Sequence, residues 1–168
     1  MKNKIIFSVL GLIAIAASSH AQSTATATAT ATVITPISIS KTADMSFGNL
    51  AVQAATGGTV VLAPAGTRTS TSGVTLPAAA GTVTAAAFTV TGSGSSTYAI
   101  TLPSSVTLTR ASGTETMSAG SFTSNPSSTG TLSSGTQNIS VGATLTVAAG
   151  QVAGTYNSGN FSVTVNYN

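Results

Sequence analysis

The sequence predicts an all-β fold, a single sandwich or barrel preceded by an extended N-terminal arm. One observation is compositional: only 4% of the 168 residues are charged, and the chain is poor in the residues that build long helices. The other is a pattern. Short stretches rich in Val, Ile, Thr and Phe alternate with Gly, Ser and Pro turns at the spacing of about 8–12 residues that is typical of all-β domains. So little charge also excludes disorder driven by net charge.

The first 21 residues have the features of a secretory signal peptide. Two lysines precede an apolar run over residues 5–17, and Ser19-His20-Ala21 is a small-x-small cleavage pattern. The run is shorter than a membrane-spanning helix of about 20 residues, so a short membrane anchor is the weaker alternative. Cleavage after Ala21 would leave 168 − 21 = 147 residues, enough for one sandwich-sized domain. We therefore expect export, with no membrane span in the mature chain.

The mature chain would hold few groups that can do chemistry. It has no cysteine, and the one histidine, His20, lies in the predicted signal peptide. Ser-His-Asp and Cys-His catalysis and the usual zinc sites are then excluded, as is a disulfide framework. Asp44 and Glu115 are the only carboxylate pair for a glycosidase, and their surroundings favour solvated charges instead. We expect no enzymatic activity, no metal and no cofactor.

The charges of the mature chain nearly balance. There are three positive side chains, Lys41, Arg68 and Arg110, and two negative ones, Asp44 and Glu115. The net charge of the mature chain is therefore 3 − 2 = +1. A basic patch for nucleic acid is therefore excluded. Lys41 and Arg68 are either contacts for an anion or a partner or, as we expect, ordinary solvated charges.

The arm, residues 22–33, begins with Gln22 and Ser23 and then alternates threonine and alanine with a period of two from Thr24 to Thr32. As a strand it would present threonines on one face and, on the other, Ala25, Ala27, Ala29, Ala31 and Val33. The register of such a strand is weakly specified, and it needs a partner sheet to become ordered. A low-complexity linker is the alternative.

Residues 34–168 are predicted to form the β domain, with about ten short strands. The segments that predict them are 37–40, 44–48, 59–64, 73–77, 85–91, 97–103, 106–109, 115–117, 142–147 and 160–167, and Phe122, Leu132 and Ile139 mark further strands. The run 85–91 should be largely buried and should form a hairpin with 97–103. Exact repeats and helical stripes are absent from this part of the sequence.

The sequence ends on a strand with one apolar face, formed by Phe161, Val163, Val165 and Tyr167. The outer edge of such a strand exposes unpaired backbone groups unless another segment covers it. The arm of a second copy would suit this edge, and head-to-tail strand addition of that kind produces a filament. Alternatively the arm, or the strand at 37–40, pairs with this strand of the same chain. The small area of alanine methyl groups favours that internal alternative.

This ending resembles that of bacterial chaperone–usher pilins. Their last strand alternates apolar residues, has a penultimate tyrosine, here Tyr167, and follows a glycine about fourteen residues before the end, a position that Gly154 fits. The resemblance implies an immunoglobulin-like, pilin-like sandwich. It also implies that the last strand pairs first with a periplasmic chaperone and then flanks a groove that a neighbour's arm fills, with an outer-membrane usher as a further partner. The chain departs from pilins in having no cysteine pair and an arm of alanines.

Over most of its length the chain resembles more closely a secreted bacterial family known as domain of unknown function 4402. The resemblance is carried by residues 37–41, 45–48, 58–60, 66–68, 87–92, 98–103, 141–145 and 154–156. It implies a secreted, pilin-like β-sandwich without an established activity. We therefore expect an exported structural protein of the cell surface, a fimbrial subunit whose partners are copies of itself or related subunits.

The alternative from another class is a secreted, monomeric carbohydrate-binding or adhesive module. Such modules use exposed aromatic platforms, and Tyr156 is the one candidate, although a packed turn aromatic is the expected role. Tyr98 and Tyr167 alternate with apolar residues and should belong to the core. The threonine row of the arm also allows an ice-binding surface, but a single strand is not a flat array.

Overall fold

The computed structural model describes residues 21–168, so the predicted signal peptide lies outside the described residues except for Ala21. The chain divides after Thr32, and we describe its two parts separately. Residues 21–32 contain neither helix nor strand, and their side chains are exposed. In the second part, Val33–Asn168, every regular element is a β-strand, which confirms the all-β prediction.

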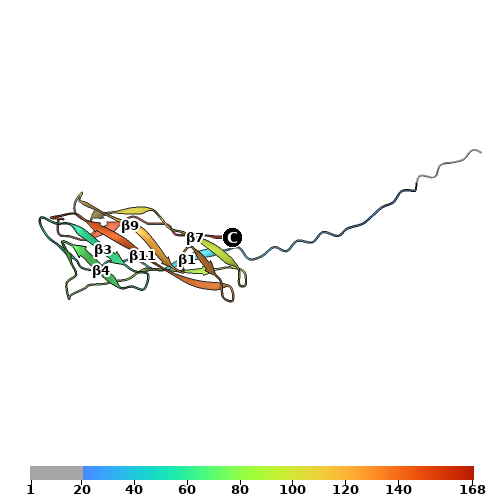
Figure 1. Cartoon of the computed structure of the whole chain (residues 1–168), viewed down its shortest axis with the longest axis horizontal. Helices are drawn as coiled ribbons and strands as arrows, with labels where there is room; N and C mark the ends of the chain where they lie inside the picture. The colour runs from blue at the N-terminus through green and yellow to red at the C-terminus, as the bar shows by residue number, and fades with distance from the viewer. Residues whose placement is uncertain (1–20) are drawn as a thin grey trace, which may run out of the picture. The chain divides into compact units, whose positions relative to one another are not determined.

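This second part contains thirteen strands (Figure 1). In chain order they are β1 (Ser38–Ala43), β2 (Ala51–Val52), β3 (Gly58–Leu62), β4 (Arg68–Ser72), β5 (Val74–Thr75), β6 (Ala86–Thr91), β7 (Thr97–Thr101), β8 (Ser105–Arg110), β9 (Thr116–Asn125), β10 (Thr129–Thr131), β11 (Thr136–Val147), β12 (Tyr156–Ser158) and β13 (Thr164–Tyr167). Most of them coincide with a segment that the period-two pattern predicts.

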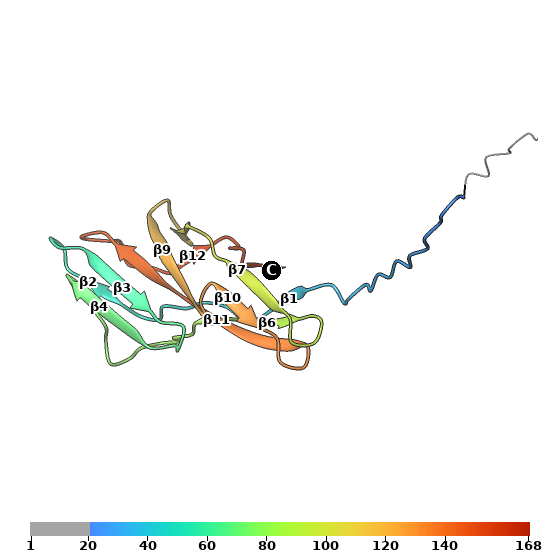
Figure 2. The ribbon, with the colours of Figure 1, turned by 45° about the vertical axis from the view of Figure 1, so that its right-hand side comes forward.

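The strands form a sandwich in which β11 is the central strand of the larger sheet. That sheet has the order β1-β6-β11-β9-β8-β12, and β3 and β4 extend it beside the second half of β11. A second sheet has the order β10-β7-β13, and β2 and β5 form a short pair. Figure 2 shows β7 and β10 lying over the part of the larger sheet that contains β6 and β11. All of these pairings are antiparallel.

Two strands are longer than the sequence predicts, because glycine does not end them. β9 includes Phe122, and β11 joins the predicted strands around Ile139 and 142–147. Gly142 lies where β11 passes from one neighbour to the next, beside a register shift in its pairing with β9. A Cβ atom at Gly142 would overlap the carbonyl oxygen of Leu62. This glycine therefore allows β3 to approach β11 closely instead of marking a turn.

The buried side chains form two clusters along the sandwich. One contains Val60, Leu62, Met117, Leu145 and their neighbours from the β3, β9 and β11 region. The other lies between the two sheets and includes Phe88, Val90, Tyr98, Ile139, Val141, Val163 and Val165. Tyr98 is fully buried, as expected, and its hydroxyl donates a hydrogen bond to Gln137 Oε1 at 2.6 Å. Burial raises the pKa of Tyr98 above its ordinary value.

The predicted hairpin between residues 85–91 and 97–103 is wrong. β6 pairs with β1 and β11, whereas β7 pairs with β10 and β13, so the two strands belong to different sheets. Phe88 and Val90 of β6 and Tyr98 of β7 contribute to one buried cluster. Consecutive apolar strands can meet face to face across a sandwich as well as side by side, and a period-two pattern does not distinguish these arrangements.

Candidate functional site

The strands nearest the two ends of the domain lie at sheet edges. β1 pairs with β6 and β13 pairs with β7, and within residues 21–168 neither strand has a neighbour on its other side in the strand order. The alternative in which the strand at 37–40 pairs with the C-terminal strand is therefore wrong. Val163 and Val165 are buried in the core, so side chains anchor the C-terminal segment while the outer backbone edge of β13 has no strand beside it in the described structure.

The hydroxyl group of Tyr167 ties the two edges together at one end. It accepts a hydrogen bond from the backbone N–H of Ser93 at 2.7 Å and donates one to the carbonyl oxygen of Thr35 at 2.8 Å. The ring is half-buried and packs against the cluster between the sheets, in agreement with the expected core role. The carboxyl end of β13 thus lies where the chain enters β1 (Figure 1).

Beyond this contact an open groove runs along the domain. One part, of about 470 Å³, has walls in residues 41–47 and 156–161. The other part, of about 710 Å³, has walls in residues 45–52 and 151–157. Both parts are lined by Met45, Phe47, Leu108, Tyr156 and Asn157, so we treat them as one feature and call it the groove.

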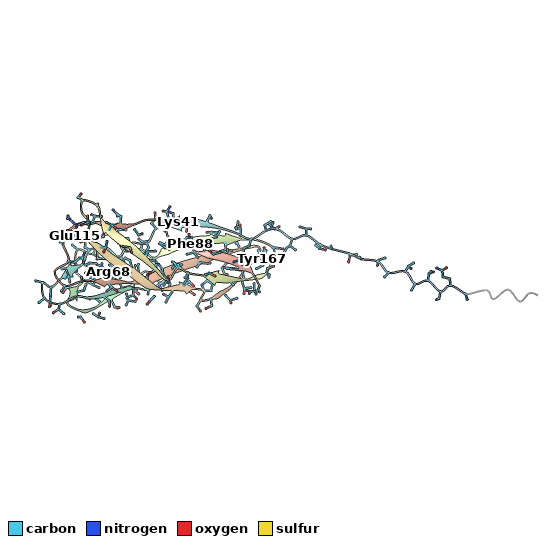
Figure 3. All side chains as sticks on the ribbon, turned by 90° about the horizontal axis from the view of Figure 1, so that it is seen from above. Lys41, Arg68, Phe88, Glu115 and Tyr167 are labelled. Atoms are coloured by element: carbon cyan, nitrogen blue, oxygen red, sulfur yellow. The ribbon has the colours of Figure 1, made fainter. Side chains whose placement is uncertain are left out.

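The floor of the groove is apolar and its rim is polar. The floor contains Phe88, Val106, Leu108, Met117 and Leu145. The rim carries the polar side chains of Lys41, Asp44, Asn49, Gln151 and Asn157. Figure 3 shows Phe88 and Lys41 part-way along the sandwich, between Tyr167 at one end and Arg68 toward the other. An apolar floor flanked by polar groups and backbone suits an extended peptide whose alternate side chains point downward.

Arg68, at the start of β4, holds the first wall in place. Its Nη1 donates to the carbonyl oxygens of Phe47 and, at 2.7 Å, of Asn49, and its Nη2 donates to that of Ala80 at 3.3 Å. The Asn49 N–H also donates to Ala80 O at 2.7 Å. The planar guanidinium group satisfies several carbonyls of a segment that is largely without strand pairing. The expectation that Arg68 is a solvated charge is therefore wrong.

Tyr156 and Gly154 shape the second wall. The Tyr156 hydroxyl accepts a hydrogen bond from Gln151 Nε2 at 2.8 Å and donates one to the carbonyl oxygen of Val152 at 2.7 Å, so it is the packed aromatic that we expected. Gly154 has a φ of +151°, and a Cβ atom there would lie 2.9 Å from Cδ of Arg110. Glycine is required at this position by backbone conformation and by space.

The five charged side chains of residues 21–168 all have partners within the chain. Arg68 binds the carbonyls described above, and Lys41 forms an exposed ion pair with Asp44 at 2.5 Å, as expected for solvated charges. Arg110 donates to Glu115 through Nε at 2.7 Å and through Nη2 at 3.2 Å. The hydrogen bond from Arg110, aided by the backbone, lowers the pKa of Glu115, and the same bond raises the pKa of Arg110.

The predicted site residues lie in three different places in the structure. It places Phe161, Val163, Val165 and Tyr167 along one segment that leads into and forms β13. It places Gly154 on the groove wall. The alanines of the arm, Ala25, Ala27, Ala29 and Ala31, are exposed and form no strand, and Val33 is 96% exposed.

Sequence reasoning missed the groove itself. Met45, Phe88 and Leu108 line it from three different segments, and Arg68 supports it. Their only signal in the sequence is that most of them fall in segments that carry the family resemblance.

Residues 21–168 contain no helix that is long and apolar enough to cross a membrane. In the same residues no group of three His, Cys, Asp or Glu side chains is arranged to hold a metal ion.

Comparison with known proteins gives one match, to a family model. The model is described as a domain of unknown function (DUF4402) and matches residues 37–167. No curated protein and no solved structure matches the chain. The matched range includes both free strand edges, the groove and Arg68. Because the model covers most of the sequence, the chain belongs to the DUF4402 family.

Proposed function

We propose that this protein is an exported, non-enzymatic structural subunit of the cell surface, of the fimbrial type, which assembles by strand addition. In this proposal the arm, residues 22–33, of one copy occupies the groove of the next. The observation that carries the proposal is the state of the C-terminal strand. β13 is anchored through Val163 and Val165, yet in the described residues its outer edge has no strand beside it, and the segment that leads into β13 lines the groove at residues 156–161.

The arm is long when extended and has two different faces. It has 33 − 22 + 1 = 12 residues. At about 3.3 Å per residue an extended arm spans roughly 40 Å. Its alanine face would point to the floor and its threonine face to water. Small methyl groups suit a floor that Phe88, Leu108 and Met117 already fill.

Backbone hydrogen bonds would supply most of the affinity. Each buried methyl group contributes about 0.8 kcal/mol, and the alanine face offers few of them. A strand that pairs with one open edge can form about one hydrogen bond per residue, each with a net value of about 0.5–1.5 kcal/mol. An arm without bulky side chains is therefore compatible with strand addition. The small area of its alanine methyl groups, which in the sequence favours pairing within the chain, does not rule out pairing between chains.

Assembly into filaments would also explain the low charge of the surface and would involve further partners. Head-to-tail addition does not close on itself, so it produces filaments of identical or related subunits. Low net charge reduces repulsion between such copies. A free strand edge is an aggregation hazard during export, which calls for a periplasmic chaperone that covers the edge and an outer-membrane usher that releases it. Nucleic acid is not among the expected partners, since the net charge is only 3 − 2 = +1.

The test compares the mature chain, residues 22–168, with a variant that lacks residues 22–33. Size-exclusion chromatography and negative-stain electron microscopy report on assembly. We expect concentration-dependent oligomers or filaments from the mature chain and monomers from the deletion variant. A third chain, in which the arm keeps its composition but loses its alternation, is the matched control and should stay monomeric. A monomeric mature chain that the deletion leaves unchanged contradicts the proposal.

The same samples test the carbohydrate-binding alternative. That alternative predicts a monomer that binds a glycan saturably and loses binding on Tyr156→Ala. Both hydrogen bonds of the Tyr156 hydroxyl group are made within the chain, to Gln151 and Val152, so the geometry offers this alternative no specific support.

A further inference from the structure

The groove contains both sulfur atoms of the mature chain. Of the three methionines, Met1 lies in the predicted signal peptide, Met45 and Met117 remain, and there is no cysteine. Met117 belongs to the buried cluster of the β3, β9 and β11 region and is 9% exposed. Met45 is half-buried and lines both parts of the groove. A peroxide that enters the groove should therefore oxidise Met45 first, because oxidation follows exposure.

Met45 lies at the junction of the two parts of the groove. Its side chain packs against both buried clusters of the sandwich. The backbone beside it is fixed, because the N–H of Ser46 donates to the carbonyl oxygen of Thr84 at 2.8 Å and the N–H of Thr84 donates to that of Ser46 at 3.0 Å. The thioether is thus kept in the groove, while the unbranched side chain can adapt to what lies above it.

We infer that the Met45 thioether is an oxidation site that controls the groove, and that its sulfoxide form no longer accepts the arm of another copy. When the sulfur attacks hydrogen peroxide, an S–O bond forms, the O–O bond breaks and water leaves. The sulfur is oxidised and the peroxide is reduced. The product is a polar group in place of an apolar one. This inference rests on the proposed function and adds a modification of the same groove.

The arm offers a sulfoxide no side-chain hydrogen-bond donor on its inner face. That face consists of alanine methyl groups and Val33, so covering the sulfoxide oxygen would remove water without replacing it. Burial of an unpaired polar group is unfavourable, and we expect the affinity for the arm to fall about tenfold or more. In a copy that has bound no arm, the sulfoxide of the half-buried Met45 can remain hydrated, so the fold itself should be kept.

Oxidation of the mature chain, residues 22–168, tests this inference. Dilute protein is treated with hydrogen peroxide, quenched and concentrated. Peptide mass spectrometry then measures the sulfoxide at each methionine, and size-exclusion chromatography and electron microscopy measure assembly. We expect Met45 to be oxidised before Met117, and assembly to decrease as the Met45 sulfoxide increases. An oxidised copy can still donate its arm, so a small oxidised fraction should shorten the filaments. Methionine sulfoxide reductase with a thiol reductant should restore them.

Two variants separate the sulfur atoms, and each is compared with its own untreated sample. Met117→Leu leaves Met45 as the only sulfur, and peroxide should raise the protein concentration needed for assembly about tenfold or more. Met45→Leu leaves Met117, and treated and untreated samples should assemble alike. Assembly should also slow the oxidation of Met45 several-fold, because the added strand covers it. The chain that lacks residues 22–33 should not show this protection at any concentration.

The outcomes separate the inference from the proposed function. An untreated mature chain that stays monomeric overturns both. If that chain assembles, the inference alone is overturned when Met117 is oxidised first, when Met45 sulfoxide is as frequent in long filaments as in monomers, or when assembly gives Met45 no protection. Equal loss of assembly in the two treated variants has the same meaning. So does a treated Met117→Leu chain whose urea midpoint collapses, because oxidation would then unfold the domain instead of blocking the groove.

Discussion

The hydroxyl group of Tyr167 donates a hydrogen bond to the carbonyl oxygen of Thr35, 132 residues earlier in the chain, at 2.8 Å. This contact joins the segment before β1 to the end of β13, although the two strands belong to different sheets. The Tyr167 side chain thus has a definite structural partner far away in the sequence.

We expect Tyr167→Phe to lower the free energy of unfolding by about 1 kcal/mol, because the backbone N–H of Ser93 loses its acceptor and Thr35 loses its donor. Both groups lie near the surface, so water replaces part of the loss. Urea denaturation followed by circular dichroism measures the change. An unchanged midpoint would mean that neither bond contributes to stability.

Gly142→Ala should destabilise the domain by about 2–3 kcal/mol, because the new methyl group would overlap the Leu62 carbonyl oxygen and push β3 away from β11. Gly159→Ala is the matched control. A Cβ atom at Gly159 meets nothing within 4 Å, so its midpoint should stay close to that of the unmodified chain. Equal midpoints for the two variants would refute the close approach.

Replacing Arg68 by methionine keeps the apolar stem and removes the donors to the carbonyls of Phe47, Asn49 and Ala80. We expect a loss of about 2 kcal/mol in stability, since these are hydrogen bonds from a charged group. Amide exchange at Asn49 should also become faster, because Arg68 positions its acceptor. Lys41→Met, which removes an exposed charge, should change neither quantity. Normal exchange at Asn49 in Arg68→Met would show that the wall holds without this side chain.

Acid should weaken the fold through Glu115. Its pKa in the folded chain lies below the ordinary value of 4.5, mainly because Arg110 donates a hydrogen bond to the carboxylate. A carboxyl group with a lowered pKa stabilises the fold above its unfolded pKa, and that stability is lost as the pH falls through the folded value. The urea midpoint should therefore decrease between about pH 5 and pH 3. Glu115→Gln should flatten this decrease, and an equally steep decrease in the variant would contradict the assignment.

Local patterns in the sequence predict much of the fold. The alternation that predicts β6, β7 and the C-terminal strand depends only on neighbouring residues, and Val90, Tyr98 and Val165 are buried as it requires. The same patterns do not predict which strands pair with one another. β6 and β7 read as a hairpin in the sequence but face one another across the sandwich, because pairing depends on segments far away in the chain.

The groove could not be predicted for a related reason. Its first wall is mostly irregular backbone without a periodic signal, and Arg68 reaches it from 19 and 21 residues away. In the sequence Arg68 is a single charged residue between two threonines, a pattern typical of a solvated charge. Only the structure shows the carbonyl oxygens that it binds. Gly142 misleads in the same way, since a glycine that admits a neighbouring strand and a glycine that ends a strand look identical in a sequence.

In the proposed assembly the arm of one copy pairs with the open edge of β13 and continues into the groove lined by the segment before β13. A peptide of residues 22–33, added to a chain of residues 34–168, tests it directly by hydrogen–deuterium exchange. We predict saturable binding and slower amide exchange at Thr164–Tyr167, because the peptide pairs with the open edge of β13. A peptide with Ala27→Asp and Ala29→Asp should not bind, whereas one with Thr26→Asp and Thr28→Asp should still bind. Unchanged exchange at Thr164–Tyr167 with saturating peptide, or equal protection by both charged peptides, would contradict the claim.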